Sequence, residues 1–288
     1  LEAAKKRHEA SDHLLFYGQA GLGKTTLAHL VAKELSANIK ITSGTALEKA
    51  GDVGSILTSL SDGDVLFIDE VHRLNKTIEE VIYPAMENFK LDIIIGKGNS
   101  AKTLQIDLPK FTLIAATTKI SLLSAPFRSR FGVNLKLDFY KEPEIEKIIK
   151  RSASLLKILV DADAANIIAK ASRATPRVAN RLLKRVRDYA QIKDLPAINA
   201  ALANEGLKML EIDHRGLEET DRKILLAIAD KFSGGPVGLK SIAAAISEEE
   251  NTIEDVYEPY LMQLGFLDRT PKGRIVTPNG LKHLGLPV

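Results

Sequence analysis

A glycine-rich segment near the N-terminus has the residue types and the spacing of a phosphate-binding loop. Residues 18–25 read GQAGLGKT, which matches the pattern G-x-x-x-x-G-K-T between an apolar run and a helical pattern. Glycines let backbone N–H groups close around the β- and γ-phosphates of a nucleotide, and the lysine adds a point charge. A chance glycine turn is the alternative, which the strand–loop–helix context disfavours. The residues expected to contact ATP or ADP are Gly18, Gly21, Leu22, Gly23, Lys24, Thr25 and Thr26.

Two adjacent carboxylates would complete the chemistry of such a loop. Asp69 and Glu70 follow the apolar run VLFI at residues 65–68, and a buried parallel strand delivers its last residues to the edge of the sheet where ligands bind. We expect Thr25 and Asp69 to hold Mg²⁺, and Glu70 to polarise the attacking water. Alone, the pair would equally suit a solvated strand end. Beside a phosphate-binding loop it indicates phosphoryl transfer.

The elements that must position these residues alternate between strand and helix in the first half of the chain. Strand-like runs cover residues 13–17, 38–42, 64–68, 111–116 and 133–137, with helical periodicity at 25–35, 53–60 and 77–88. This alternation predicts an α/β domain in which helices flank both faces of a parallel sheet. Residues 91–107 interrupt it with two apolar arms around GKGN at 96–99, which predicts an inserted β-hairpin.

Strand patterns end at residue 141. Helical patterns at 142–159, 162–172, 176–193 and 196–210 predict an all-helical second domain. Further helices are expected at 219–231, 239–246 and 252–264, followed by two short strands around a turn at 271–273 and a helical stub. This order predicts a winged-helix domain at the C-terminal end of the chain.

The composition sets limits on the class of protein. The 288 residues have an ordinary soluble balance, a net charge of +3 and no cysteine. A disulfide framework is therefore excluded, a reducing cytoplasm is expected, and any DNA-binding argument must rest on where the charge lies. The longest apolar runs fall far short of the roughly 18 residues of a membrane helix. The chain begins without Met inside a helical pattern, so we expect a fragment that lacks its native N-terminus.

Several motifs together resemble those of AAA+ ATPases. Besides the loop and the acidic pair, the chain has ATT at 116–118, SRF at 129–131 and TPR at 175–177. The resemblance narrows to the RuvB family of bacterial Holliday-junction branch-migration motors, and it extends from end to end. The segments that carry it are DEVHRL at 69–74, LDIIIGKG at 91–98, TPRVANRLL at 175–183, GGPVGL at 234–239, YEPYL at 257–261 and RTPKGR at 269–274.

The family resemblance implies a three-domain architecture, and this chain differs from the family pattern at a few positions. It implies a large ATPase domain at 1–138, a helical lid at 139–212 and a winged helix at 213–288. The family usually has Pro-Pro where this chain has Gln19 and Ala20, and Arg where it has Lys119. The glycine frame survives the first change, whereas the second loses the guanidinium fork. The family's N-terminal arm, which helps to hold adenine, is absent from this sequence.

The resemblance also implies roles for residues outside the loop. Thr118, or its neighbour Thr117, corresponds to a polar sensor of the attacking water. Arg130 corresponds to an arginine finger that reaches the γ-phosphate of a neighbouring subunit and implies a homo-oligomeric ring, expected to be a hexamer; Arg128 is the competing candidate. Two further residues, Pro176 and Arg177, correspond to a second sensor at the start of a helix. Arg181 and Arg185 share a helix face with Arg177 and are interpreted as solvated. The six histidines, His72 included, lack metal-ligand spacing and are expected at the surface or in packing.

The inserted hairpin is expected to dock a partner protein. Ile93, Ile94 and Ile95 on one arm give the hairpin two apolar faces, where a projecting hairpin normally keeps one polar. Packing onto its own domain is the alternative. The resemblance favours docking, because the corresponding hairpin of the family binds RuvA, and through that complex RuvC.

The predicted wing carries a compact cluster of cations. Arg269, Lys272 and Arg274 have only Asp268 beside them and suit phosphate contact better than base reading. The resemblance therefore implies an ATP-driven ring that moves duplex DNA at four-way junctions. An ATP-switched initiator of the replication-origin kind is the alternative, since it shares the ATPase and winged-helix layout. It would lack the hairpin and the RTPKGR wing.

Overall fold

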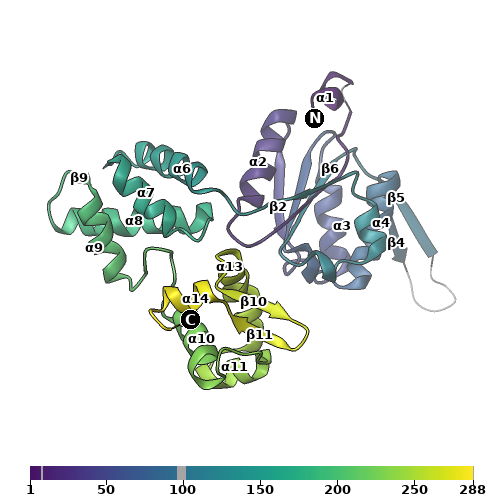
Figure 1. Ribbon diagram of the computed structural model, residues 1–288. Coiled ribbons are helices and arrows are strands. Elements are labelled where there is room, and N and C mark those ends of the chain that lie inside the picture. The colour runs from purple at the N-terminus through teal and green to yellow at the C-terminus, as the bar shows by residue number, and fades with distance from the viewer. Residues whose placement is uncertain (8, 96–101, 288) are drawn as a thin grey trace. The chain divides into compact units, whose positions relative to one another are not determined.

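The computed structural model describes residues 1–7, 9–95 and 102–287, with side chains for all of them except 94, 95, 102 and 103. The chain divides into two compact units, Leu1–Phe139 and Tyr140–Val288 (Figure 1). In these described ranges, no helix combines the length and the apolar character that crossing a membrane requires.

The first unit is built on a five-stranded parallel sheet with strand order β2-β3-β6-β1-β7. Its strands are β1 (Leu14–Tyr17), β2 (Ile39–Ser43), β3 (Val65–Asp69), β6 (Thr112–Thr117) and β7 (Val133–Lys136). Its helices are α1 (Glu2–Arg7), α2 (Lys24–Leu35), α3 (Ala50–Thr58), η1 (Val71–Arg73), α4 (Lys76–Asn88), η3 (Ile120–Leu122) and α5 (Ala125–Ser129). The expected α/β alternation is confirmed.

Helices flank the sheet (Figure 1). Apolar side chains alternate between its two faces and are buried on both. On one face, Phe16, Phe67 and Ile114 pack against α2. On the other, Leu15, Ile68 and their neighbours pack against α3 and α4. The continuous apolar runs of the central strands follow from this double burial.

The hairpin insertion lies between α4 and β6. Strands β4 (Lys90–Ile95) and β5 (Lys102–Asp107) pair antiparallel, with Leu91 opposite Ile106 and Ile93 opposite Leu104. Both expected arms are therefore present. The expected turn at 96–99 lies outside the described residues.

The second unit begins with the lid. Its elements are α6 (Glu142–Leu155), β8 (Leu159–Val160), α7 (Ala162–Lys170), α8 (Pro176–Ile192), β9 (Ala197–Ile198) and α9 (Ala200–Met209). The expectation of an all-helical lid is wrong in one respect, because β8 and β9 form a two-stranded parallel sheet. Two-residue strands are too short to show periodicity, and their partners lie 38 residues apart in the register Leu159 to Ala197.

A winged-helix fold completes the second unit. Its helical elements are α10 (Glu219–Leu226), η4 (Ala227–Lys231), α11 (Leu239–Ile246), α12 (Glu250–Thr252), η5 (Ile253–Tyr257), α13 (Glu258–Gln263) and α14 (Pro278–His283). The wing is the antiparallel pair β10 (Leu267–Thr270) and β11 (Gly273–Val276). Gly273 has φ +139°, and a Cβ there would lie 2.4 Å from the Val237 carbonyl oxygen, so only glycine fits the start of β11.

Candidate functional site

The phosphate-binding loop connects the buried end of β1 to the first turn of α2. Gly18 has φ +146°, and a Cβ at this position would lie 2.3 Å from the Leu137 carbonyl oxygen. Gly21 and Gly23 also have left-handed φ angles, of +83° and +95°. These conformations turn the chain tightly enough to place the N-terminus of α2 at the loop, where the backbone N–H groups of the first helical turn favour phosphate.

The side chains of Lys24 and Thr25 contact the loop backbone and the end of β3. Lys24 is 7% exposed, and its Nζ donates to the Gly18 and Gln19 carbonyl oxygens at 2.8 and 2.9 Å. Thr25 Oγ1 lies 3.4 Å from Asp69 Oδ2. One hydroxyl and one carboxylate suit Mg²⁺, which keeps most of its ligands as water and phosphate oxygens. The described residues hold no group of three His, Cys, Asp or Glu that would form an all-protein metal site.

Glu70 lies directly after β3, in a left-handed conformation with φ +48°. Its N–H donates to Asp69 Oδ1 at 3.0 Å, and its side chain is 41% exposed. Thr118 Oγ1 donates to Glu70 Oε2 at 3.3 Å, whereas Thr117 is fully buried. The geometry therefore favours Thr118 over Thr117 as the group that acts together with Glu70.

His72 is brought to the same place, whereas its sequence position predicts only a surface or packing role. Its side chain is 5% exposed, and its Nδ1 lies 3.2 Å from Glu70 Oε2 and 2.9 Å from Thr117 Oγ1. The tight turn η1 after Glu70 folds the chain back on the strand end. The sequence contains one sign of this contact, which is that His72 stands two residues after Glu70. That spacing indicates a contact only once the turn η1 is known.

Arg130 is held at the C-terminal end of α5 by contacts with α4. Its guanidinium lies 4.1 Å above the Tyr83 ring and pairs with Glu87 at 2.9 Å. Its Nη1 donates to the Pro126 carbonyl oxygen at 2.6 Å. Arg128 is exposed and points its side chain to solvent. Burial raises the pKa of the Tyr83 hydroxyl, which also bonds to Glu79 and Ser124.

The second unit carries the remaining nucleotide candidates. The Thr175 side chain caps α8 by accepting the Val178 N–H, Pro176 occupies the first turn, and Arg177 follows it at the exposed N-terminus of the helix. Arg181 pairs with Glu218 at 2.7 Å and Arg185 with Asp188 at 3.4 Å. Their paired state is consistent with the interpretation of that face as surface.

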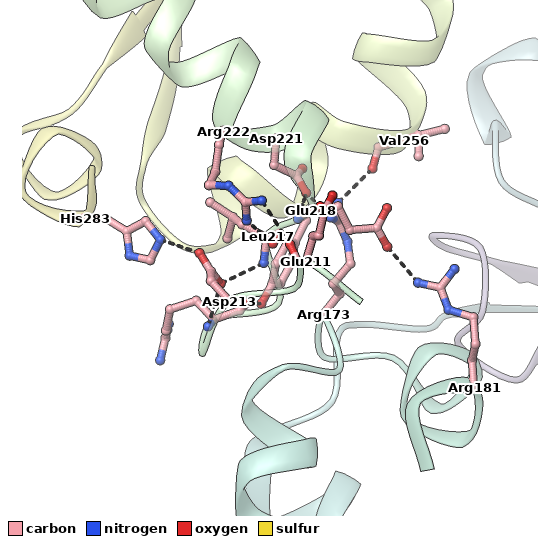
Figure 2. Close-up of polar contacts among 12 residues, drawn as sticks. Arg173, Arg181, Glu211, Asp213, Leu217, Glu218, Asp221, Arg222, Val256 and His283 are labelled. Carbon is pink, nitrogen blue, oxygen red and sulfur yellow. Dashed lines mark hydrogen bonds and ion pairs between the residues drawn. The ribbon is translucent and has the colours of Figure 1, made fainter. Parts of the chain in front are cut away.

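A buried ion pair joins the lid to the winged helix within the second unit. Figure 2 shows Arg173, from the loop before α8, pointing at Asp221 of α10, which it meets at 2.5 Å. Arg173 also donates to the Val256 carbonyl oxygen at 3.3 Å and lies 4.6 Å above the Tyr260 ring. Asp221 is fully buried, and burial raises its pKa although Arg173 opposes the shift. Burial also raises the pKa of Tyr260 to about 12.

A second set of contacts fixes the loop between the lid and the winged helix. The Asp213 carboxylate accepts from the Arg215 and Leu217 N–H groups at 2.8 and 2.9 Å and lies 2.7 Å from His283 Nε2. Arg222 of α10 donates to the carbonyl oxygens of Glu211 and Leu217 (Figure 2). The lid and the winged helix are therefore attached by charged groups on both sides of this loop.

The wing departs from the expectation of an unpaired positive tip. Arg274 is 9% exposed and pairs with Glu258 at 3.0 Å, and Arg269 pairs with Glu254 at 2.9 Å. Within the wing sequence Asp268 is the nearby acid, whereas the actual partners Glu254 and Glu258 lie on η5 and α13. Lys272 is exposed at the turn between the strands. Arg274 is thus built into the support of the wing, while Lys272 and the half-exposed Arg269 reach its surface.

The hairpin has a buried base and an exposed outer part. Leu91 is 1% exposed and Ile106 packs against the core of the first unit. Further out, Ile93 and Leu104 face each other across the strands and are 36% and 50% exposed. The packing alternative therefore holds for the base of the hairpin, whereas the outer part is exposed and docking there stays a prediction. The side chains of Ile94 and Ile95, also expected in the docking face, lie outside the described residues.

Comparisons with known proteins match this arrangement along the whole chain. Residues 1–137 match the Holliday junction DNA helicase RuvB P-loop domain, residues 140–213 the RuvB AAA lid domain and residues 214–285 the RuvB C-terminal winged helix domain. A Holliday junction branch migration complex subunit RuvB of Clostridium kluyveri is 56% identical over 283 residues, which are 98% of this chain and 81% of that protein.

Solved structures give the same result. A structure described as the Thermotoga maritima RuvB Holliday junction branch migration motor has a TM-score of 0.89 and 52% identity, covering all of this chain and 92% of the other. A mutant of the same protein has a TM-score of 0.90 and 52% identity, again over all of this chain and 92% of the other. The expected fold class and the expected family are confirmed. The chain belongs to the RuvB family of P-loop AAA+ ATPases.

Proposed function

We propose that this protein is an ATP-driven motor that moves duplex DNA and drives branch migration of Holliday junctions in recombination and repair. The observation that carries the proposal is the meeting of Lys24, Thr25, Asp69 and Glu70 at one edge of the sheet, in a chain that matches RuvB proteins from end to end. The initiator alternative has no comparable support, since the hairpin and the wing both belong to the family pattern.

The residues of the site divide the work of ATP hydrolysis. Lys24 binds the β- and γ-phosphates, and Thr25 and Asp69 would hold Mg²⁺, which neutralises charge on the phosphate oxygens when bound. Glu70 orients and polarises the attacking water, and Thr118 holds both the water and the Glu70 carboxylate. Catalysis of this kind depends on placing groups around the γ-phosphate more than on covalent chemistry.

Two arginines connect hydrolysis to the assembly. We assign Arg130 as the finger that enters the site of a neighbouring subunit, which requires a homo-oligomeric ring, proposed to be a hexamer. Arg177, with Pro176 fixing the first turn of α8, is assigned to the γ-phosphate of its own subunit. Because the lid is tied to the winged helix by Arg173 and Asp221, a change of the lid at Arg177 would be carried to the DNA-binding domain.

The wing and the hairpin are the surfaces that we assign to partners. Lys272 and Arg269 are assigned to phosphates of duplex DNA at four-way junctions, and Arg274 to the support of the wing. The hairpin around Ile93 is assigned to RuvA, and through it the protein works with RuvC. The proposed place of action is the cytoplasm.

The test compares two variants of the ATPase site. Glu70→Gln is expected to abolish turnover while ATP stays bound, because the amide cannot take up a proton. Lys24→Ala is expected to lose binding as well. In addition, mixing Arg130→Ala subunits with Lys24→Ala subunits should restore hydrolysis at mixed interfaces. Equal loss of binding in Glu70→Gln and Lys24→Ala would refute the assignment of Glu70, and no activity at any mixing ratio would refute the finger in trans.

A further inference from the structure

The carboxylate of Glu70 needs a means of being held in one orientation. Glu70 is the residue after the end of β3, and 41% of its side chain is exposed. An exposed glutamate has several rotamers, and holding it in one of them costs side-chain entropy. A group that is to polarise one water must therefore be restrained by its neighbours.

Two neighbours meet the same oxygen of Glu70. Thr118 Oγ1 lies 3.3 Å and His72 Nδ1 lies 3.2 Å from Oε2. Of the two donors, the histidine is the more rigidly placed, since its side chain is 5% exposed and lies in the tight turn η1. Both contacts fall on Oε2, so Oε1 is the oxygen that is available to the water.

A donor role of His72 toward Glu70 decides which ring nitrogen must carry the proton. A carboxylate only accepts hydrogen bonds, so the contact with Glu70 requires a hydrogen on Nδ1. The single hydrogen on Nδ1 is then shared between Glu70 Oε2 and Thr117 Oγ1, which lies 2.9 Å from Nδ1 and also accepts the Lys119 N–H at 3.0 Å. Thr117 is fully buried at the end of β6, so the imidazole is anchored to the sheet on one side and reaches Glu70 on the other.

We propose that His72 is a positioning residue for Glu70: its Nδ1–H, fixed by Thr117, holds Glu70 Oε2 and thereby aims Oε1 at the attacking water. The inference rests on the proposed role of Glu70. His72 makes no contact with nucleotide in this assignment and acts only through the carboxylate. It should therefore affect the rate of hydrolysis and leave nucleotide affinity unchanged.

Three substitutions separate positioning from packing. The amide nitrogen of His72→Asn takes the place of Nδ1, whereas that of His72→Gln takes the place of Nε2, and His72→Ala removes both. A misplacement of about 1 Å costs about 100-fold in rate, so we expect kcat to fall about 10- to 100-fold in His72→Ala and His72→Gln. His72→Asn should recover kcat to within a few-fold of the parent. ATP dissociation constants should be the same in all three variants.

Controls make the result specific. Unfolding midpoints of all variants are measured, and if His72→Ala does not fold, the comparison of Asn with Gln decides, because both keep a polar side chain.

A kcat for His72→Ala within two-fold of the parent would overturn the inference, as would a His72→Gln variant at least as active as His72→Asn. The proposed function fails separately, through a Glu70→Gln variant that still turns over ATP. An inactive Glu70→Gln variant beside a fully active His72→Ala variant would refute the role of His72 alone.

Discussion

Removal of Arg173 should destabilise the junction between the lid and the winged helix. Asp221 is fully buried and accepts from Arg173 and from the Glu218 N–H, while no donor in the described part of the chain reaches its Oδ1. Arg173→Ala would leave this carboxylate buried without its counter-charge and would also remove the stacking on Tyr260. Breaking a buried pair in this way costs about 3–5 kcal/mol.

Removal of the charge of Asp221 should lower the free energy of unfolding less than removal of Arg173 does. Asp221→Asn keeps an oxygen for the Glu218 N–H, and Arg173 retains 11% exposure and its bond to the Val256 carbonyl oxygen. We expect a loss of about 1–3 kcal/mol, the scale of a lost charged hydrogen bond. The double variant Arg173→Ala/Asp221→Asn should lose less than the sum of the two single changes, because no unpaired charge remains.

The pH dependence gives an independent signature. Burial raises the pKa of Asp221 above its ordinary value of 3.8, and loss of Arg173 raises the pKa further. Between that raised pKa and 3.8 the folded state binds a proton that the unfolded state does not, so the free energy of unfolding rises as the pH falls. The deficit of Arg173→Ala should therefore shrink from pH 7 towards pH 4.

Urea unfolding followed by hydrogen exchange provides the measurement, because peptides from α10 and α13 report on this junction separately from the first unit. Arg181→Ala, which removes an exposed pair with Glu218, is the matched control and should cost less than about 1 kcal/mol. The reasoning would be refuted if Arg173→Ala lowered the free energy of unfolding only as much as Arg181→Ala does. It would also be refuted if the losses of the two single variants added strictly in the double variant.

Three further outcomes follow from named contacts. Burial lowers the pKa of His13 from 6.5, so the contribution of His13 to the free energy of unfolding should be fully present above pH 6.5 and be lost as the pH falls towards the lowered pKa, whereas His13→Phe should lack this contribution in pH-resolved urea titrations. Lys272→Ala should flatten the log-salt slope of duplex binding by about one unit with an unchanged unfolding midpoint, whereas Arg274→Ala should lower the midpoint because Glu258 loses its buried partner. Ile93→Asp should weaken RuvA binding in a pull-down assay and leave basal ATPase unchanged, and an unfolded variant would instead show that Ile93 serves packing.

The parts of the molecule that the sequence predicts are those set by local spacing. The glycine pattern of residues 18–25 and the strand before Asp69 fix the loop and the acidic pair, since both depend on near neighbours in the chain. The alternation of apolar residues on β1 and β3 predicts the doubly covered sheet for the same reason.

The parts that escaped prediction depend on distant partners. Arg274 was counted as free because Glu258 lies 16 positions away on another element. The Arg173–Asp221 pair spans 48 positions, and neither residue has a motif that marks it. His72 reaches Glu70 only because η1 reverses the chain, which periodicity cannot show. A pairing between distant elements is set by tertiary packing, and no pattern within one segment specifies it.

We propose that this protein couples ATP hydrolysis to the movement of duplex DNA through a four-way junction. The most direct measurement is the dissociation of a synthetic four-way junction with and without RuvA. We predict that dissociation requires hydrolysable ATP and is stimulated by RuvA, and that Lys24→Ala and Glu70→Gln abolish it. Dissociation that proceeds equally with Glu70→Gln, or binding of the junction without any ATP-dependent dissociation by the wild-type protein and RuvA together, would contradict the claim.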